Sequence, residues 1–218
     1  MQKQRRGAGS TVATKVVMAV TGIILVAYLV AHVAANLTIF GGPEMINQYA
    51  ATLREVPALL WGARIVLLVA AVLHIWSALR LTALKRASRP VGYRAYKYRA
   101  GTFAARTIRL GGVLLLVFIV FHILHFTTGS VHPDFVEGDV HRNVISGLRV
   151  GWVNLFYIVA MGALGLHLAH GVWSAFQSLG VTNPRVERYR KGIALVLAIG
   201  IAGGFTLIPL AIMTGFLE

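Results

Sequence analysis

Five long apolar stretches restrict what this sequence can fold into. Each has about 20 residues or more, the length an α-helix needs to cross the hydrocarbon core of a bilayer. The stretches are continuous and lack the apolar–polar alternation of barrel strands, so helices are the expected spans. We therefore predict an all-α integral membrane protein that forms a single domain over residues 1–218. The expected spans cover residues of about 14–40, 57–81, 107–128, 152–179 and 192–216.

The composition agrees with this class and excludes others. Hydrophobic residues make up 57% of the chain and charged residues only 13%, against roughly 25% charged residues in soluble domains. A soluble nucleic-acid-binding protein would place its cations on a hydrated surface, and a disordered chain would have far less apolar content. We therefore expect no nucleic-acid partner, despite a formal charge of +14. The chain has no cysteine, so it provides no ligands for an iron–sulfur cluster of its own.

The charged residues are sorted between the two ends of the predicted spans. Most of the 21 Lys and Arg residues precede the first span or lie around the loops after the second and fourth spans. By the positive-inside rule, the N-terminus is expected in the cytoplasm and the C-terminus outside. The first apolar stretch is too long for the core of a signal peptide, and we expect it to be retained. The basic, tyrosine-containing loop at residues 85–106 is expected to touch lipid headgroups or to bind a cytoplasmic partner.

Histidines stand out within the spans, where ionisable residues are expensive and point to function. Apart from His132 and His141 in the acidic outer loop, for which we expect no special role, all of the 8 histidines fall in the first four spans. We estimate the depth of each histidine by counting residues along its span. Two spans each carry one histidine at a similar depth on the outer side, and the other two spans each carry one histidine on the inner side. The two levels are roughly 15 Å apart at 1.5 Å of rise per residue. The four histidines at matched depths are His32 and His122 on the outer side and His74 and His167 on the inner side.

Two neutral imidazoles from opposing helices can bind the iron of a b-type haem from its two faces. Two pairs at two depths therefore predict two stacked haems, with the first four helices as a bundle around them. Spacing does not choose between His122 and His125, or between His167 and His170, because each pair shares a helix face. His125 and His170 could line a quinone or proton site, contact haem propionates, or bond to a backbone carbonyl. Small residues that could make room for a porphyrin or a neighbouring helix are Gly22, Gly111, Gly112, Gly162, Gly165 and Gly171.

Four segments resemble the cytochrome b membrane-anchor subunit of succinate:quinone oxidoreductases (complex II) and of the related fumarate reductases. They are TGIILVAYLVAHVAAN, VLHIWSALRL, FIVFHILHF and HLAHGVWSAFQSLGVTNPR. The chain is similar to the type with one five-helix subunit and two haems, and the resemblance covers essentially the whole chain. It implies one axial histidine from each of the first four helices. These are His32 and His122 for the distal, outer haem and His74 and His167 for the proximal, inner haem. It also implies a haem environment that includes His170, Trp173, Ser174, Gly22 and Gly171.

The resemblance implies an electron-transfer subunit of a succinate dehydrogenase, without catalytic residues that can be named with certainty. Electrons would pass from an iron–sulfur subunit through the proximal and then the distal haem to a quinone, typically menaquinone in this class. A flavoprotein and the iron–sulfur subunit would dock on the cytoplasmic face of a bacterial cytoplasmic membrane, and a higher oligomer of the complex is compatible with this arrangement. Quinone-site candidates are His125, Glu44, Glu55 and Arg64 on the outer side and Ser10, Lys15, Thr21 and Arg80 on the inner side.

Two alternatives to a succinate dehydrogenase anchor are open from the sequence. A quinol:fumarate reductase anchor would use the same haems in the reverse direction, and sequence does not distinguish the two. A haem-free transporter or proton channel with titratable histidines belongs to a different class. It is disfavoured because five spans divide poorly into two repeats, and no span has a mid-helix Gly/Pro break suited to an ion site.

Overall fold

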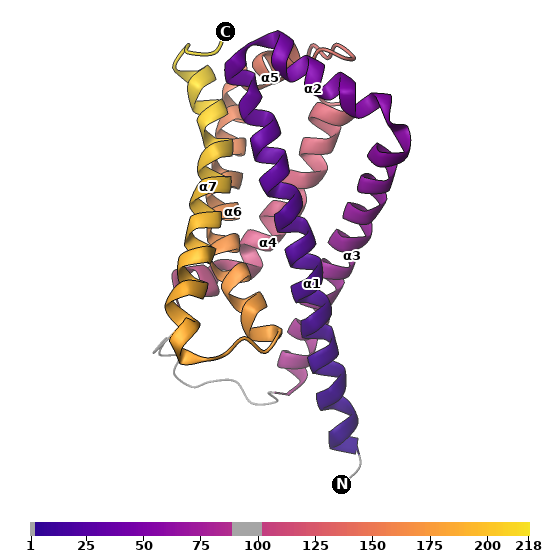
Figure 1. The fold of residues 1–218 in the computed structure, drawn as a ribbon, viewed down its shortest axis with the longest axis vertical. Coiled ribbons are helices and arrows are strands. Elements are labelled where there is room, and N and C mark those ends of the chain that lie inside the picture. Colours follow the sequence, from indigo (N-terminus) through magenta and orange to yellow (C-terminus); the bar gives the residue numbers. More distant parts are fainter. Residues whose placement is uncertain (1–2, 89–101) are drawn as a thin grey trace.

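The computed structural model describes residues 3–88 and 102–218, with side chains from residue 11 onward in the first of these segments, so that of Ser10 lies outside the described part. Within these residues every regular element is helical, and the predicted all-α fold is confirmed (Figure 1). In chain order the elements are α1 (Lys3–Leu37), the 3₁₀ turn η1 (Thr38–Gly41), α2 (Pro43–Glu55), α3 (Pro57–Ala87), α4 (Phe103–His122), the π-helical turn η2 (Ile123–Thr127), α5 (Val140–Arg149), α6 (Gly151–Ser178), the 3₁₀ turn η3 (Pro184–Val186) and α7 (Glu187–Met213).

Five helical segments of the described chain are long and apolar enough to cross a membrane, as predicted. They are Thr11–Gly41, Pro57–Ala87, Phe103–Thr127, Gly151–Ser178 and Pro184–Met213. Several ends differ from the sequence-based estimates because helical hydrogen bonding continues beyond the apolar residues. The fifth segment begins at Pro184 rather than at residue 192. The third begins after Thr102, whose hydroxyl caps α4 by accepting a hydrogen bond from the Ala105 amide at 3.2 Å.

Two short helices, α2 and α5, lie across the end of the bundle that carries the C-terminus (Figure 1). The predicted topology places this end outside the cytoplasm, and we refer to it as the outer end and to the opposite end as the inner end. α2 starts after Gly42, whose φ of 96° is a left-handed conformation that favours glycine. The Asn47 side chain joins the two helices, because it donates to Asp139 Oδ1 at 3.0 Å and accepts from the His141 amide at 3.0 Å. Hydropathy gives no sign of this outer cap, because both helices are short and largely polar.

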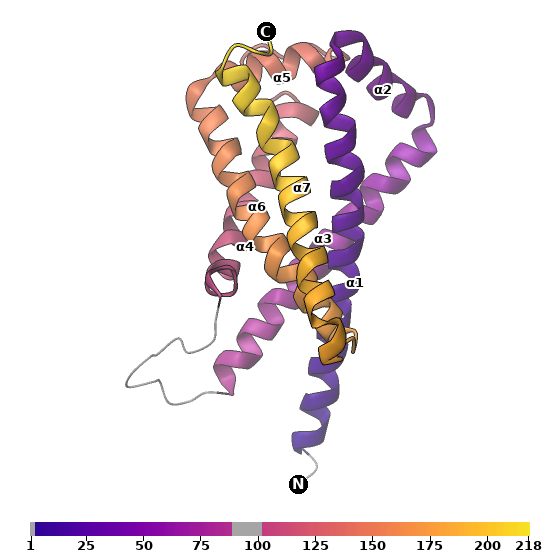
Figure 2. The same ribbon diagram turned by 60° about the vertical axis from the view of Figure 1, so that its left-hand side comes forward.

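Helices α1, α6 and α7 pack along one another, with α3 against α1 and α4 against α6 (Figure 1, Figure 2). Small residues permit the closest approaches. A Cβ at Gly165 of α6 would lie 3.3 Å from the Ala202 Cβ of α7, and one at Gly204 of α7 would lie 2.6 Å from the Val33 side chain of α1. Within the described residues, α1–α4 and α3–α6 are not among the helix pairs that pack closely. These two pairs of helices, which are not packing neighbours, carry the four histidines at matched depths.

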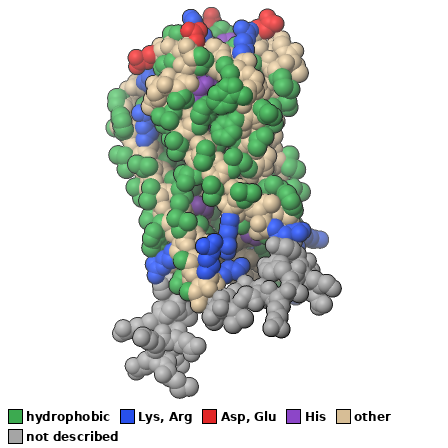
Figure 3. Space-filling view, turned by 180° about the vertical axis from the view of Figure 1, so that it is seen from behind, with side chains coloured by type: hydrophobic (Ala, Val, Ile, Leu, Met, Phe, Trp, Pro, Cys, Tyr) green, Lys and Arg blue, Asp and Glu red, His purple; other side chains and the backbone are tan. Residues whose placement is uncertain are grey.

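The sides of the bundle are apolar, as expected for a surface against lipid. Leu68, Leu110 and Val196 are among many large apolar side chains that are exposed. On the face shown in Figure 3, hydrophobic side chains cover the middle. Lys and Arg side chains lie at both ends, whereas Asp and Glu side chains lie at the outer end. The two termini lie at opposite ends (Figure 1). This distribution agrees with the positive-inside argument, and the orientation itself stays a prediction.

Asn154 of α6 is a buried polar side chain that joins separate segments. Its amide nitrogen donates to the Leu148 carbonyl at 3.0 Å and to the Pro209 carbonyl of α7 at 2.9 Å. Asn154→Ala leaves both buried carbonyls without this donor, so we expect a loss of about 1–3 kcal/mol in the free energy of unfolding. The midpoint of thermal unfolding in detergent measures it. Thr206→Ala is the control, because the Thr206 hydroxyl donates to Ala202 O within its own helix; equal midpoints for the two variants would contradict the role of Asn154.

The Asp139 carboxylate makes the outer cap sensitive to acid. The hydrogen bond from Asn47, and then that from the Arg142 amide, hold the pKa of Asp139 below its usual value. A carboxyl group with a lowered folded-state pKa contributes stability above its unfolded pKa of about 4, and loses it as pH falls through the folded-state value. We therefore expect hydrogen exchange in α2 and α5, corrected for intrinsic rates, to speed up below about pH 4. Asn47→Ala should reduce this acid dependence, whereas Thr52→Ala on the same helix should keep it.

Candidate functional site

The outer histidine pair joins α1 to α4. The ring centroids of His32 and His122 are 6.0 Å apart, with an interplanar angle of 84°. Tyr28 stacks on His32 at 5.1 Å, and Phe205 of α7 lies 5.4 Å from the same ring. Phe118 stacks on His122 at 5.6 Å. Both imidazoles therefore lie in an aromatic environment that suits a flat, largely apolar ligand.

The inner histidine pair joins α3 to α6. The ring centroids of His74 and His167 are 6.3 Å apart, at an interplanar angle of 57°. His74 Nδ1 lies 3.1 Å from the Met18 carbonyl oxygen and 3.3 Å from the Thr21 hydroxyl. Since that hydroxyl donates its proton to Val17 O at 2.7 Å, the Nδ1–H group donates to the Met18 carbonyl. This bond leaves Nε2 available to bind a metal, and a carbonyl partner on the other nitrogen is typical of metal-bound histidines.

Both pairs have the spacing that a metal between two imidazoles requires. A metal-bound imidazole nitrogen lies about 2 Å from the metal and about 1.1 Å from its own ring centre, so rings on opposite sides have centres roughly 6 Å apart. The observed separations are 6.0 Å and 6.3 Å. Because α1–α4 and α3–α6 are not packing neighbours, the rings meet where no direct helix contact holds them together. The geometry fits a bis-histidine haem site at each pair.

The number of histidine ligands at each pair also fits a haem. In residues 3–88 and 102–218, no three His, Asp or Glu side chains gather into a metal site made by protein alone. A haem iron takes four ligands from its porphyrin, so two imidazoles are sufficient. Every hydrogen bond of the His32, His74 and His122 rings in the structure uses Nδ1, which leaves Nε2 free. His167 has a buried Nδ1 without a hydrogen-bond partner, so no protein group among the described residues fixes the tautomer of this ring.

Glycines border the inner pair. A Cβ at Gly22 of α1 would lie 3.3 Å from His74 Cε1. Cβ atoms at Gly112 of α4 and Gly171 of α6 would lie 3.9 Å and 4.0 Å from atoms of the His167 ring. A larger side chain at Gly22 would press on the His74 ring and disturb its bond to the carbonyl oxygen. Gly22 therefore helps to keep this imidazole in place.

The contacts along two helices give the depth of the pairs. On α6, Tyr157 contacts His122 of the outer pair, and His167 follows about 15 Å further along the helix. On α1, Thr21 contacts the inner pair, and His32 follows about 16 Å further along. The two pairs therefore lie at levels about 15 Å apart along the bundle.

Tyr157 connects the two histidines at the end of the third span. Its hydroxyl oxygen lies 3.3 Å from His122 Nδ1 and 3.1 Å from His125 Nδ1. Of these two histidines, His122 is the one beside His32, whereas His125 is buried and stacks on His132 at 4.8 Å. Tyr157 was not among the expected site residues. The available signal was its helical distance from His167, which puts it at the level of the outer pair.

The expectation that His132 has no special role is wrong. Its side chain is buried, Nε2 lies 2.9 Å from the Asn143 carbonyl oxygen, and Nδ1 accepts a hydrogen bond from the Asp134 amide at 3.0 Å. Because Nε2–H donates and Nδ1 accepts, these partners hold the ring as one neutral tautomer. α5 folds across the outer end and covers this loop. The sequence gives no indication of that coverage, since it depends on contacts between distant segments.

Trp173, expected near a haem, connects α6 to α7. Its indole N–H donates to Glu187 Oε1 at 3.1 Å. The Glu187 carboxylate also pairs with Arg190, which is buried. His170 has its ring centroid 5.9 Å from that of Trp173 and lies outside the inner pair, and Ser174 is half-buried. These residues stabilise the helical hairpin at the inner end.

The quinone-site candidates are dispersed. Thr21 and His125 are buried beside the two histidine pairs. The guanidinium groups of Arg64 and Arg80 each lie over a tryptophan ring, 4.9 Å and 5.1 Å from its centre. Four candidates are exposed: Glu44, Glu55, Arg64 and Lys15. The structure does not bring the candidates together at one place.

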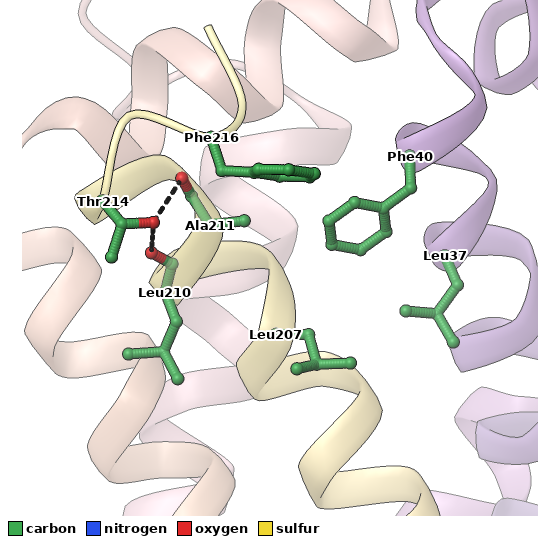
Figure 4. A pocket seen from close by; sticks show the side chains of 7 residues that line it. All are labelled: Leu37, Phe40, Leu207, Leu210, Ala211, Thr214 and Phe216. Atoms are coloured by element: carbon green, nitrogen blue, oxygen red, sulfur yellow. Dashed lines mark hydrogen bonds between the residues drawn. The ribbon is translucent and has the colours of Figure 1, made fainter.

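An apolar groove opens at the outer end between α1 and α7 (Figure 4). It is lined by Leu37, Phe40, Leu207, Leu210, Ala211, Thr214 and Phe216. Phe40 and Phe216 face each other with centroids 6.3 Å apart. The Thr214 hydroxyl donates to the carbonyls of Leu210 and Ala211 in its own helix, so the groove offers contacts to hydrocarbon rather than a polar site.

One known protein with a significant sequence match is the succinate dehydrogenase cytochrome b558 subunit of Bacillus subtilis. The chain is 25% identical to it over 96 residues, which are 43% of this chain and 46% of the relative. The match thus spans less than half of the length of that relative. No family model matches the chain, and no solved structure gives a significant match.

Gly147 of α5 lies directly against two buried imidazoles. A Cβ there would lie 2.7 Å from His125 Cε1 and 2.8 Å from His132 Nε2. Because both rings are packed, Gly147→Ala should force them apart and lower the free energy of unfolding by about 1–3 kcal/mol. Thermal unfolding in detergent measures this change. Gly162→Ala is the matched control, since nothing lies within 4 Å of its Cβ position; a Gly147→Ala protein as stable as that control would contradict the packing.

Proposed function

We propose that this chain is the two-haem cytochrome b anchor of a membrane-bound succinate dehydrogenase. The observation that carries the proposal is the pair of imidazole contacts, 6.0 Å and 6.3 Å between ring centres, that bridge helices which are not packing neighbours. The similarity to a succinate dehydrogenase cytochrome b subunit supports the same assignment from an independent direction. When bound, the two b haems would supply one-electron carriers at two depths, between an iron–sulfur subunit and a quinone.

The residues of each pair have defined tasks in this proposal. His32 and His122 hold the distal haem near the outer end, and His74 and His167 hold the proximal haem nearer the inner end. The Met18 carbonyl fixes the His74 ring through Nδ1–H, so that Nε2 points to the ligand. The aromatic rings around the outer pair exclude water from it, which matters because burial tunes the potential of a haem.

The soluble partners are proposed at the inner end. This chain has no cysteine and cannot hold an iron–sulfur cluster by thiolate ligands. A flavoprotein subunit and an iron–sulfur subunit would therefore supply succinate oxidation. The cations at the inner end offer a surface for them (Figure 3). By the positive-inside rule, these cations support an orientation with that end in the cytoplasm of a bacterial cell.

The quinone, proposed to be menaquinone, reaches its site from the lipid. Accessibility therefore favours the exposed Glu44, Glu55 and Arg64 at the outer end and Lys15 at the inner end over the buried Thr21 and His125. Reduction near the outer end would couple electron transfer to the membrane potential, because moving one charge across 100 mV is worth about 2.3 kcal/mol.

Histidine replacement tests the haem assignment. The purified protein should contain two b haems per chain, measured as the haem-to-protein ratio and by reduced-minus-oxidised spectra. His74→Ala removes one axial ligand of the inner pair, so it should retain one haem, and His32→Ala should lose the other. His141→Ala is the control, because His141 lies in the outer cap, where its backbone amide contacts Asn47. A folded wild-type protein without haem would overturn the proposal and would favour a haem-free transporter or channel.

A further inference from the structure

A row of polar rings runs from the outer histidine pair toward the outer cap. It begins at His122, continues through the Tyr157 hydroxyl to His125, and ends with the His125 ring stacked on His132. The row is enclosed by protein, because His125 is 1% exposed and Tyr157 and His132 are also buried. Burying three polar rings is costly unless they are hydrogen-bonded, so the arrangement calls for a specific role.

The hydrogen-bond partners fix the direction of each bond. A histidine that binds iron through Nε2 carries its proton on Nδ1, so His122 donates to the Tyr157 oxygen. The single Tyr157 proton is then directed to His125 Nδ1, 3.1 Å away. His125 carries its own proton on Nε2, which is buried and has no hydrogen-bond partner among the described residues. The rings of His122 and His125 and the Tyr157 hydroxyl each have one defined proton position, and all three groups are neutral.

His125 is held away from the outer pair by its surroundings. It lies in η2, where the Thr128 amide bonds to the Ile123 carbonyl at 3.0 Å in the wider, π-helical pattern. The ring is packed between Phe126 at 4.2 Å, His132 at 4.8 Å and the bare backbone of Gly147. It therefore cannot replace His122 as a ligand without unpacking α5.

We infer that Tyr157 and His125 are positioning residues that fix the tautomer and ring orientation of His122 and thereby lower the reduction potential of the outer haem. The inference rests on the proposed function. A hydrogen-bond acceptor at Nδ1–H makes the ligand imidazole more basic, which favours the oxidised iron. His125 acts through Tyr157. Its Nδ1 accepts a hydrogen bond from the Tyr157 hydroxyl, and this bond keeps the lone pairs of the hydroxyl oxygen turned toward His122.

The inner pair provides an internal reference. There the Nδ1–H group of His74 donates to a backbone carbonyl, which no side-chain substitution removes. A change in the Tyr157–His125 support should therefore move the potential of one haem and leave the other unchanged. A general destabilisation of the bundle would shift the potentials of both haems.

The test is a redox titration of the purified complex, followed by visible spectra, for four variants. Tyr157→Phe removes the hydroxyl and keeps the ring, and His125→Leu removes the acceptor of the hydroxyl proton. His125→Asn offers an amide oxygen near the position of Nδ1 and should restore the wild-type potential. Tyr189→Phe is the matched control, because its hydroxyl is at the inner end, beside Arg188.

We expect Tyr157→Phe and His125→Leu to raise the potential of the outer haem alone, with two haems per chain retained. Haem titration of the apoprotein should show an affinity at that site about 10-fold or more below wild type. If Tyr157→Phe does not assemble, His125→Leu and His125→Asn provide the same comparison.

Three results would overturn the inference. They are an unchanged outer potential in Tyr157→Phe, equal shifts of both haems, and loss of one haem in His125→Asn, which would make His125 itself a ligand. These results are distinguishable from failure of the proposed function, which would show as a wild-type protein without haem and would remove both proposals together.

Discussion

The lipid bilayer provides no water to hydrogen-bond, so polar groups inside the bundle must find partners within the protein or in a bound ligand. This constraint makes the backbone helical in every span. It also explains the side-chain arrangement: Asn154 donates to two carbonyls outside its own turn, and the His74 ring donates to the Met18 carbonyl. The hydrogen bonds of the His32, His74 and His122 rings are at Nδ1, so their Nε2 atoms are the groups for which a ligand is the natural partner.

α6 organises most of the molecule. It packs on α7 through Gly165, it carries His167 at the level of the inner pair, and it carries Tyr157 at the level of the outer pair. One rigid helix therefore sets the distance between the two levels. α7 carries no histidine and packs on α6 and α1. It therefore supports these two helices, which carry residues of both pairs.

The outer cap packs over the residues that lie beside the outer histidine pair. α5 covers His125 and His132, and Asn47 links α5 to α2. His125, which α5 covers, contacts the same Tyr157 hydroxyl as the His122 ring. At the inner pair, the His74 ring is instead fixed by a backbone carbonyl of α1. The two histidine pairs thus differ in which protein groups hold their rings.

The sequence by itself determined the five spans, the segregation of charge and the depth of four histidines. These features follow from local physics: apolar length against bilayer thickness, and a fixed rise per residue. Helical spacing left His122 and His125 as equals, His132 was treated from the sequence as a loop residue, and Tyr157 was not singled out. Only the tertiary structure decided these points, because they depend on which helices meet and on the π-helical turn after His122. Helical spacing specifies height along an axis, whereas rotation about that axis and contacts between distant segments are set by packing.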